Sequence, residues 1–138
     1  PEPLISARLI ARGATLDPNV ITTAVSVNPT RTWKSGDAIG ASLLSRSDSG
    51  WLYALPLRRG FAIAPIIIEL LDTVEPWTER LLNAIDSGST SLTVFCGIQF
   101  CEQAPDCSID RDTIQRIGRL GAGLAIDVVL RADESVVT

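Results

Sequence analysis

The sequence predicts an α/β (α+β) two-layer sandwich, in which helices pack on one face of a single mixed or antiparallel sheet of at least four strands. Three observations favour this fold. Apolar residues alternate, or run continuously, in several segments of strand length. Segments with apolar residues at helical spacing lie between these strands, and residues that favour helix ends flank them. Strands and helices therefore interleave along one chain and do not form separate blocks.

The first strand is expected over residues 5–12, where small and apolar side chains alternate with polar ones. A helix should follow over residues 18–26. Asp17 can accept the free N–H groups at its start, and Pro18 suits the first helical position. Pro29 should end this segment, because the residue before a proline is disfavoured in helical geometry.

Residues 30–50 are polar and rich in turn-forming residues, so we expect an excursion there. The next strand is expected over residues 51–55, which are aromatic and branched. Residues 57–64 fit either an extension of the sheet or a loop. A short buried helix is expected over residues 65–72.

A second helix should begin at Glu75 and end at Gly88, which would serve as its C-cap. Residues 91–100 are expected to form a strand. Asp110 is a candidate N-cap for a helix over residues 109–118. The last strand is expected over residues 124–130, and its near-continuous apolar character predicts burial on both sides or a central position.

The length of 138 residues fits a single domain, with a core over roughly residues 5–130 and a tail over 131–138. Its most apolar run, residues 61–71, is too short to span a membrane. No signal-peptide pattern is visible, and three cysteines cannot form a full disulfide framework, so a location in the reducing cytoplasm is expected. The net charge of −4 argues against nucleic acid as a partner and permits a basic protein partner.

The chain contains no histidine, which removes Ser-His-Asp and Cys-His arrangements and the commonest general base. Cys96 lies in an apolar run and is expected to be a buried thiol. Cys101 and Cys107 could pair with each other, but they do not have zinc-site spacing, so no metal and no cofactor are expected. The glycines of residues 118–123 follow a helix and precede a strand, which is the wrong order for a dinucleotide-binding motif. We therefore expect no catalytic residues, although an enzyme stays open as an alternative.

The segment from Pro29 to Asp37 reads Pro-Thr-Arg-Thr-Trp-Lys-Ser-Gly-Asp and is typical of a structured loop. Trp33 is expected to pack over the sheet with its indole N–H bonded nearby. Asp37 should close a turn or cap the segment. A candidate binding site is formed by this loop together with the next tryptophan, which we expect in the core beside Trp33. Its residues are Arg31, Trp33, Lys34, Asp37 and Trp51.

This nine-residue motif resembles the bacterial domain of unknown function 4279. The resemblance extends over roughly residues 5–130 and includes Leu16-Asp17-Pro18, Gly50-Trp51 and the Leu-x-Ile-Asp strand at Leu124 to Asp127. The family brings no established reaction. The resemblance implies a kinship with the immunity partners of bacterial toxins.

The leading hypothesis is a non-enzymatic protein-binding module, an immunity protein that occludes the active surface of a toxin encoded by a neighbouring gene. Acidic side chains would steer it to a basic toxin. The candidates for these contacts are Asp48, Asp72, Glu75, Glu102 and Asp106. Two alternatives remain: a small-ligand site or enzyme at Arg31, Trp33 and Asp37, and a structural subunit of a homo-oligomer. The sequence leaves the oligomeric state open.

Overall fold

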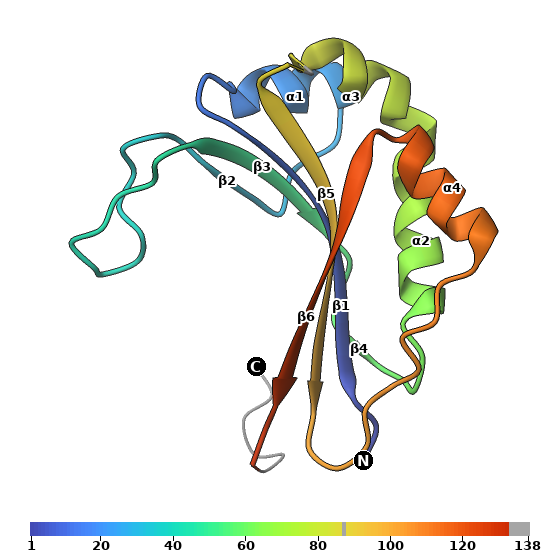
Figure 1. The fold of residues 1–138 in the computed structure, drawn as a ribbon. Coiled ribbons are helices and arrows are strands. Elements are labelled where there is room, and N and C mark those ends of the chain that lie inside the picture. The colour runs from blue at the N-terminus through green and yellow to red at the C-terminus, as the bar shows by residue number, and fades with distance from the viewer. Residues whose placement is uncertain (87, 133–138) are drawn as a thin grey trace.

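The computed structural model describes residues 1–86 and 88–132, and the predicted tail lies largely outside this range. Its centre is a mixed sheet in the order β2-β3-β1-β5-β6, with a short β4 beside β1 (Figure 1). The strands are β1 (Leu4–Gly13), β2 (Arg31–Trp33), β3 (Ser49–Ala54), β4 (Arg58–Arg59), β5 (Thr90–Phe100) and β6 (Ala122–Leu130). The four strands expected from the sequence are all present, and the predicted fold class is confirmed.

The neighbouring strands are antiparallel except for β5 and β6, which run parallel. A parallel pair needs a crossover connection. Helix α4 (Arg111–Arg119) supplies it, and its N-terminus lies where the sequence predicts. The carboxylate of Asp110 accepts the backbone N–H of Thr113 at 2.8 Å, as expected of an N-cap.

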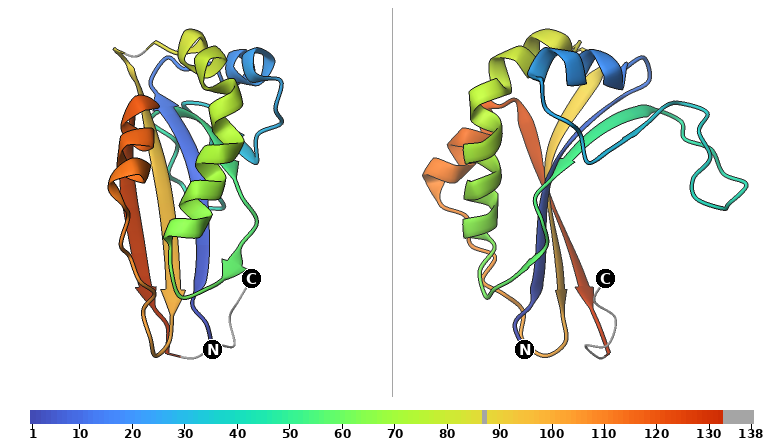
Figure 2. Two further views of the ribbon diagram at one scale, coloured as in Figure 1. Left: turned by 90° about the vertical axis from the view of Figure 1, so that its right-hand side faces the viewer. Right: turned by 180° about the vertical axis from the view of Figure 1, so that it is seen from behind.

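All helices of residues 1–86 and 88–132 lie on one side of the sheet, and this part of the chain places none on the other side (Figures 1 and 2). Besides α4, this layer contains α1 (Pro18–Val25), α2 (Ala64–Val74), the 3-10 turn η1 (Glu75–Trp77) and α3 (Thr78–Ala84). The core lies between the layers. Alternate residues of β1, from Ile5 to Ala11, are buried against the helices, whereas their neighbours on the same strand face the opposite side.

The third helix ends earlier than the sequence predicts. It stops at Ala84, and Ile85 is already extended, so Gly88 is not its C-cap. The cause is a turn at Asp86, whose carboxylate accepts the N–H of Gly88 at 3.0 Å and whose carbonyl accepts that of Thr90 at 2.8 Å. Such local side-chain bonds compete with helix formation.

The last strand was expected to be central or buried on both sides, and this prediction is wrong. Within the described part of the chain β6 pairs only with β5 and forms the edge of the sheet. Leu124, near its start, packs against the core. Farther along, Ile126 is 40% exposed, Val128 52% and Leu130 68%. The apolar run therefore does not report burial here, because the helix layer covers only the beginning of this strand.

Candidate functional site

The motif segment forms strand β2 and the beginning of the long connection to β3, and this connection projects away from the body of the domain (Figure 1). Trp33 pairs with Gly50 in the β2–β3 register, on the helix-free face of the sheet. Its indole lies across the backbone of Gly50, and a β-carbon at that position would overlap the ring. The residue is only 6% exposed, so the expectation that Trp33 packs over the sheet is confirmed.

Hydrogen bonds fix the indole and the base of the hairpin. The Trp33 indole N–H donates to Oδ1 of Asp48 at 3.2 Å. The backbone N–H of Ser35 donates to the hydroxyl of Ser49 at 3.0 Å. Both bonds join residues on opposite arms of the connection, so they tie the arms together where they leave the sheet.

Three guanidinium groups surround the Trp33 ring. Their Cζ atoms lie 4.6 Å (Arg46), 5.5 Å (Arg12) and 6.0 Å (Arg31) from the ring centroid. These distances permit cation–π attraction. Of the three, only Arg31 was a candidate from the sequence.

Lys34 and Asp37 form the turn that follows Trp33. The carboxylate of Asp37 accepts the backbone N–H of Lys34 at 2.7 Å, and the N–H of Asp37 donates back to the carbonyl of Lys34 at 2.9 Å. Gly36 adopts φ = 95° in this turn, a conformation that favours glycine. Asp37 thus closes the turn, as expected, and both charged side chains are exposed.

Trp51 is buried but does not lie beside Trp33, which corrects that prediction. Its register partner on β2 is Thr32, so its side chain points to the helix face. There its ring meets that of Trp77 edge-on at 5.8 Å, and its indole N–H donates to Oγ1 of Thr22 at 3.1 Å. Trp51 therefore belongs to the core and not to the surface around Trp33.

The five predicted acidic contacts are dispersed over the molecule. Asp48 lies beside Trp33. Asp72 and Glu75 both accept hydrogen bonds from the guanidinium of Arg116, at 2.6 and 2.7 Å, in the helix layer. The hydrogen bonds from Arg116 hold the pKa of Glu75 below its ordinary value.

The remaining two acidic residues, Glu102 and Asp106, lie in the connection between β5 and α4 and are exposed. Oδ1 of Asp106 accepts the backbone N–H of Ser108 at 2.8 Å, and hydrogen bonding to Ser108 lowers the pKa of Asp106. The five residues therefore do not form one continuous acidic surface.

Sequence reasoning missed the arginines of the helix-free face. Arg8 and Arg12 interrupt the apolar alternation of β1 on the side away from the core, and the guanidinium of Arg8 lies 4.5 Å from the ring centroid of Phe95. The sequence contained a signal for these two residues, because Arg8 and Arg12 lie on the same face of the predicted strand, one on each side of Ile10. Arg46 could not be found in this way, since only the folded hairpin brings it to Trp33.

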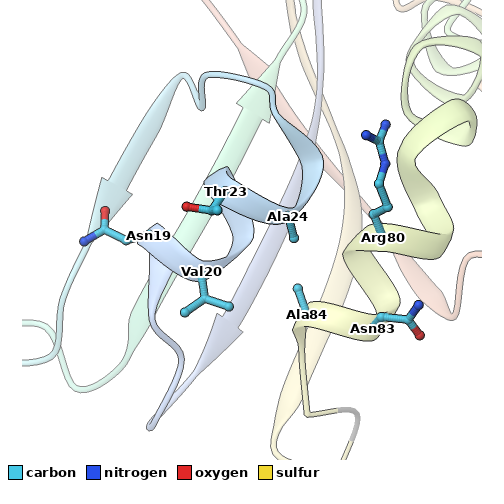
Figure 3. A pocket seen from close by; sticks show the side chains of 7 residues that line it. All are labelled: Asn19, Val20, Thr23, Ala24, Arg80, Asn83 and Ala84. Atoms are coloured by element: carbon cyan, nitrogen blue, oxygen red, sulfur yellow. The ribbon is translucent and has the colours of Figure 1, made fainter.

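A groove of about 590 Å³ separates α1 and α3 and contains none of the predicted site residues. Figure 3 shows Ala24 and Ala84 facing each other across it. The polar ends of Asn19 and Thr23 point away on the α1 side, that of Asn83 points away on the α3 side, and the guanidinium of Arg80 extends upward in the view. A ligand site usually combines an apolar cavity with polar groups that converge on one point. This groove lacks such convergence.

The described residues offer no other specialised centre. Among residues 1–86 and 88–132, no three cysteine, aspartate or glutamate side chains are arranged to hold a metal ion. No helix within that range is long and apolar enough to cross a membrane. Cys96 is fully buried, as expected, whereas Cys107 is exposed.

Fold and site together define a small α+β domain with one helix-free sheet face and a hairpin whose tryptophan is packed on that face. The chain belongs to the family described as Domain of unknown function (DUF4279), whose model matches residues 3–130. No curated protein and no solved structure matches it.

Proposed function

We propose that this chain is a non-enzymatic protein-binding module, which acts as an immunity protein by covering the active surface of a toxin encoded by a neighbouring gene. The single observation that supports a binding role best is the sheet face without helices. A largely antiparallel sheet normally has one face in the core and one exposed to solvent, and the solvent-exposed face is usually polar. Here that face contains the aromatic rings of Trp33 and Phe95 and a set of arginines.

The arrangement suits binding better than turnover. Trp33 is held by Gly50 below it and by Asp48 at its edge, so the base of the docking face is already fixed before a partner docks. Aromatic and arginine side chains are the residue types that contribute most at protein interfaces. The carboxylate of Asp37, the acid in the alternative ligand-site hypothesis, is already engaged by backbone N–H in its turn.

The dispersed acidic residues take a smaller role in this proposal. Asp72 and Glu75 are partnered by Arg116, so they contribute to the overall charge and not to a docking patch. The partner instead meets the face of β1, β2, β3 and β5. The net charge of −4 would still attract a partner that is basic overall and accelerate encounter at low salt, whereas the local contact is made by the arginine-bearing face.

Co-expression with the product of the neighbouring gene tests the proposal. That product should be toxic alone and harmless with this chain, and the two should co-elute as a one-to-one complex. A product that is harmless alone, or that stays lethal in the presence of this chain, would refute the immunity role.

A matched pair of variants tests the docking face. Thr93 lies on the helix-free face of β5, opposite Ile10 of β1, whereas Gln115 is exposed on α4. Thr93→Tyr should weaken the complex, because a bulky ring would hold the partner away from the sheet. Gln115→Tyr should bind as the wild type does. Equal affinities for the two variants would place the interface elsewhere.

A structural homo-oligomer subunit is the second candidate function, and the exposed edge strand β6 favours it. An apolar edge strand can pair with the same strand of another copy. Light scattering on the eluted protein distinguishes the two cases. A stable dimer that Val128→Lys converts to a monomer would support an oligomeric role.

A further inference from the structure

We infer that the helix-free face binds a carboxylate-rich segment of its protein partner, and that the anchors are Arg8, Arg12, Arg31 and Arg46. This inference rests on the proposed function and adds the chemistry of the partner. Register places Arg8 and Arg12 on the same face of β1, and Arg31 on that face of β2. The hairpin brings Arg46 over the same surface, at the ring of Trp33.

The guanidinium groups are positioned by rings and not by carboxylates. Arg8 lies over Phe95, and the other three surround Trp33. Within residues 1–86 and 88–132, none of the four is in an ion pair. A guanidinium stacked on a ring keeps its in-plane N–H groups free, and those groups match both oxygens of a carboxylate.

Elsewhere two arginines are paired with carboxylates. Arg58 of β4 forms a bidentate pair with Glu69 of α2, and Arg116 of α4 binds both Asp72 and Glu75. Within residues 1–86 and 88–132, the remaining helix arginines, Arg80, Arg111 and Arg119, form no ion pair, but they are not grouped around aromatic rings. The chain is acidic overall, so intramolecular partners are abundant. An acidic chain that leaves four arginines together without a carboxylate partner has a surface suited to an external anion.

Arg8 supplies an independent observation. Its Nε atom is buried and has no hydrogen-bond partner among the described residues. A buried donor without a partner is costly, and native proteins rarely keep one. A carboxylate bound beside Arg8 would accept this N–H together with a neighbouring terminal N–H.

Two hollows on the face could receive such groups. Arg12 and Asp48 line a cavity of about 380 Å³, and Arg8 and Asp127 line a smaller one of about 90 Å³. Neither aspartate is within ion-pair distance of its arginine. These aspartates would repel a continuous polyanion, whereas separate carboxylates on a polypeptide can avoid them.

A polypeptide fits better than a nucleic acid for a further reason. Proteins that bind single strands usually offer open aromatic faces on which bases stack. The indole of Trp33 has Gly50 on one side and Arg46 over its ring, and Phe95 is beneath Arg8. The arginine edges remain available, but the ring faces do not.

The test uses the purified chain and three probes: a fluorescein-labelled oligoglutamate peptide, a labelled oligothymidylate of equal length, and inorganic phosphate as a competitor. Fluorescence anisotropy at low salt should show peptide binding that weakens as salt approaches about 0.1 M. The peptide should bind more tightly than the oligonucleotide, and phosphate should compete only weakly. Tighter oligonucleotide binding, or displacement of the peptide by phosphate at low concentration, would overturn the inference.

Charge-matched variants locate the site. Arg8→Gln/Arg46→Gln should lower peptide affinity at least tenfold, whereas Arg80→Gln/Arg111→Gln, with the same charge change in the helix layer, should lower it less than threefold. Arg8→Lys/Arg46→Lys keeps the charge and removes the planar fork, so it should fall between them. Equal losses in the two glutamine doubles would show that only net charge matters. Thermal melts identify any variant that fails to fold. If Arg8→Gln/Arg46→Gln does not fold, the peptide affinity of Arg8→Lys/Arg46→Lys decides whether these two arginines bind the peptide.

Loss of peptide binding would leave the immunity role itself untouched. In that outcome the neighbouring gene product could still form its complex on this face through apolar contacts. If the chain binds the peptide but forms no complex with the neighbouring gene product, the proposed partner is refuted and the acidic-ligand site is retained. The two failures are therefore distinguishable.

Discussion

The indole of Trp33 occupies the space that a side chain at Gly50 would fill. The two residues are register partners on β2 and β3, and a β-carbon at Gly50 would overlap the six-membered ring of the indole. This relationship explains why glycine and tryptophan occur at these positions. Because Gly50 has no side chain, the Trp33 indole packs directly on its backbone. The guanidinium groups of Arg12, Arg31 and Arg46 then surround this ring.

Replacing Gly50 with alanine should displace the indole and destabilise the domain by about 1–3 kcal/mol, the usual cost of overpacking. Gly50 has no positive φ, so the backbone itself tolerates alanine and the clash with the ring is the main cost. Urea unfolding measures the effect. Combined with Trp33→Ala, the same substitution should cost much less, because the overlapping ring is gone. Additive losses in the double variant would contradict the packing of the Trp33 indole against Gly50.

Truncating the indole should itself be expensive. Trp33→Ala is expected to lower the free energy of unfolding by roughly 3–5 kcal/mol, as for other buried aromatic residues. Asp48→Ala, which removes only the acceptor for the indole N–H, should cost about 1 kcal/mol. Thermal and urea denaturation provide both values. An unchanged midpoint for Trp33→Ala would mean that the ring does not anchor the hairpin.

The bond from the Trp51 indole to Thr22 joins the sheet to α1 and gives a third prediction. Thr22→Val keeps the shape of the side chain but removes the acceptor, which leaves an N–H in the core without a partner. The expected cost is about 1–3 kcal/mol. Thr22→Ser, which keeps the hydroxyl, should cost less than half as much. A valine variant as stable as the serine variant would show that the indole finds another acceptor.

Much of the fold followed from local sequence patterns. The helix starts at Asp17 and Asp110 could be predicted, because an N-cap depends on residues within one turn of it. The alternation of β1 was equally informative, since every core residue of that strand is two positions from the next. Fold class needed only the order of such elements along the chain.

The site was less predictable, because it depends on contacts between distant residues. Trp33 and Trp51 were expected together, but the β2–β3 register assigns them to opposite faces, and a long connection separates the strands that set this register. The grouping of Arg8 with Arg46 depends on that same pairing and on the path of the hairpin. No local pattern contains this information.

The edge position of β6 predicts that a lysine substitution there destabilises the domain less than one in the interior strand β5. Val128 is half exposed, so Val128→Lys should change stability by no more than about 0.5 kcal/mol. Its neighbour in the register, Ile98, is buried, and Ile98→Lys should prevent folding or cost several kcal/mol. Chemical denaturation checks both. A severe loss for Val128→Lys in a chain shown to be monomeric would contradict the exposed edge.

The buried thiol of Cys96 predicts how stability changes in alkaline solution. Desolvation, with a smaller contribution from Cys107, raises the pKa of the Cys96 thiol to about 11. In the unfolded chain the pKa of a cysteine thiol is about 8.5. The protonated thiol therefore stabilises the fold fully below that pH, and its contribution is lost as pH rises toward the folded value. The free energy of unfolding should fall by about 2 kcal/mol between pH 8 and pH 10.5 on account of this group.

Urea unfolding over that pH range measures the slope in three proteins. Cys96→Ala should be less stable at neutral pH, because it leaves a small cavity, but its alkaline slope should be shallower than that of the wild type. Cys107→Ala is the control, because this thiol is exposed and its removal should leave most of the slope in place. A thiol reagent at pH 8 should label Cys107 quickly and Cys96 only on unfolding. Parallel slopes for the wild type and Cys96→Ala, or rapid labelling of Cys96 in the folded protein, would show that the thiol is not held in the dry interior.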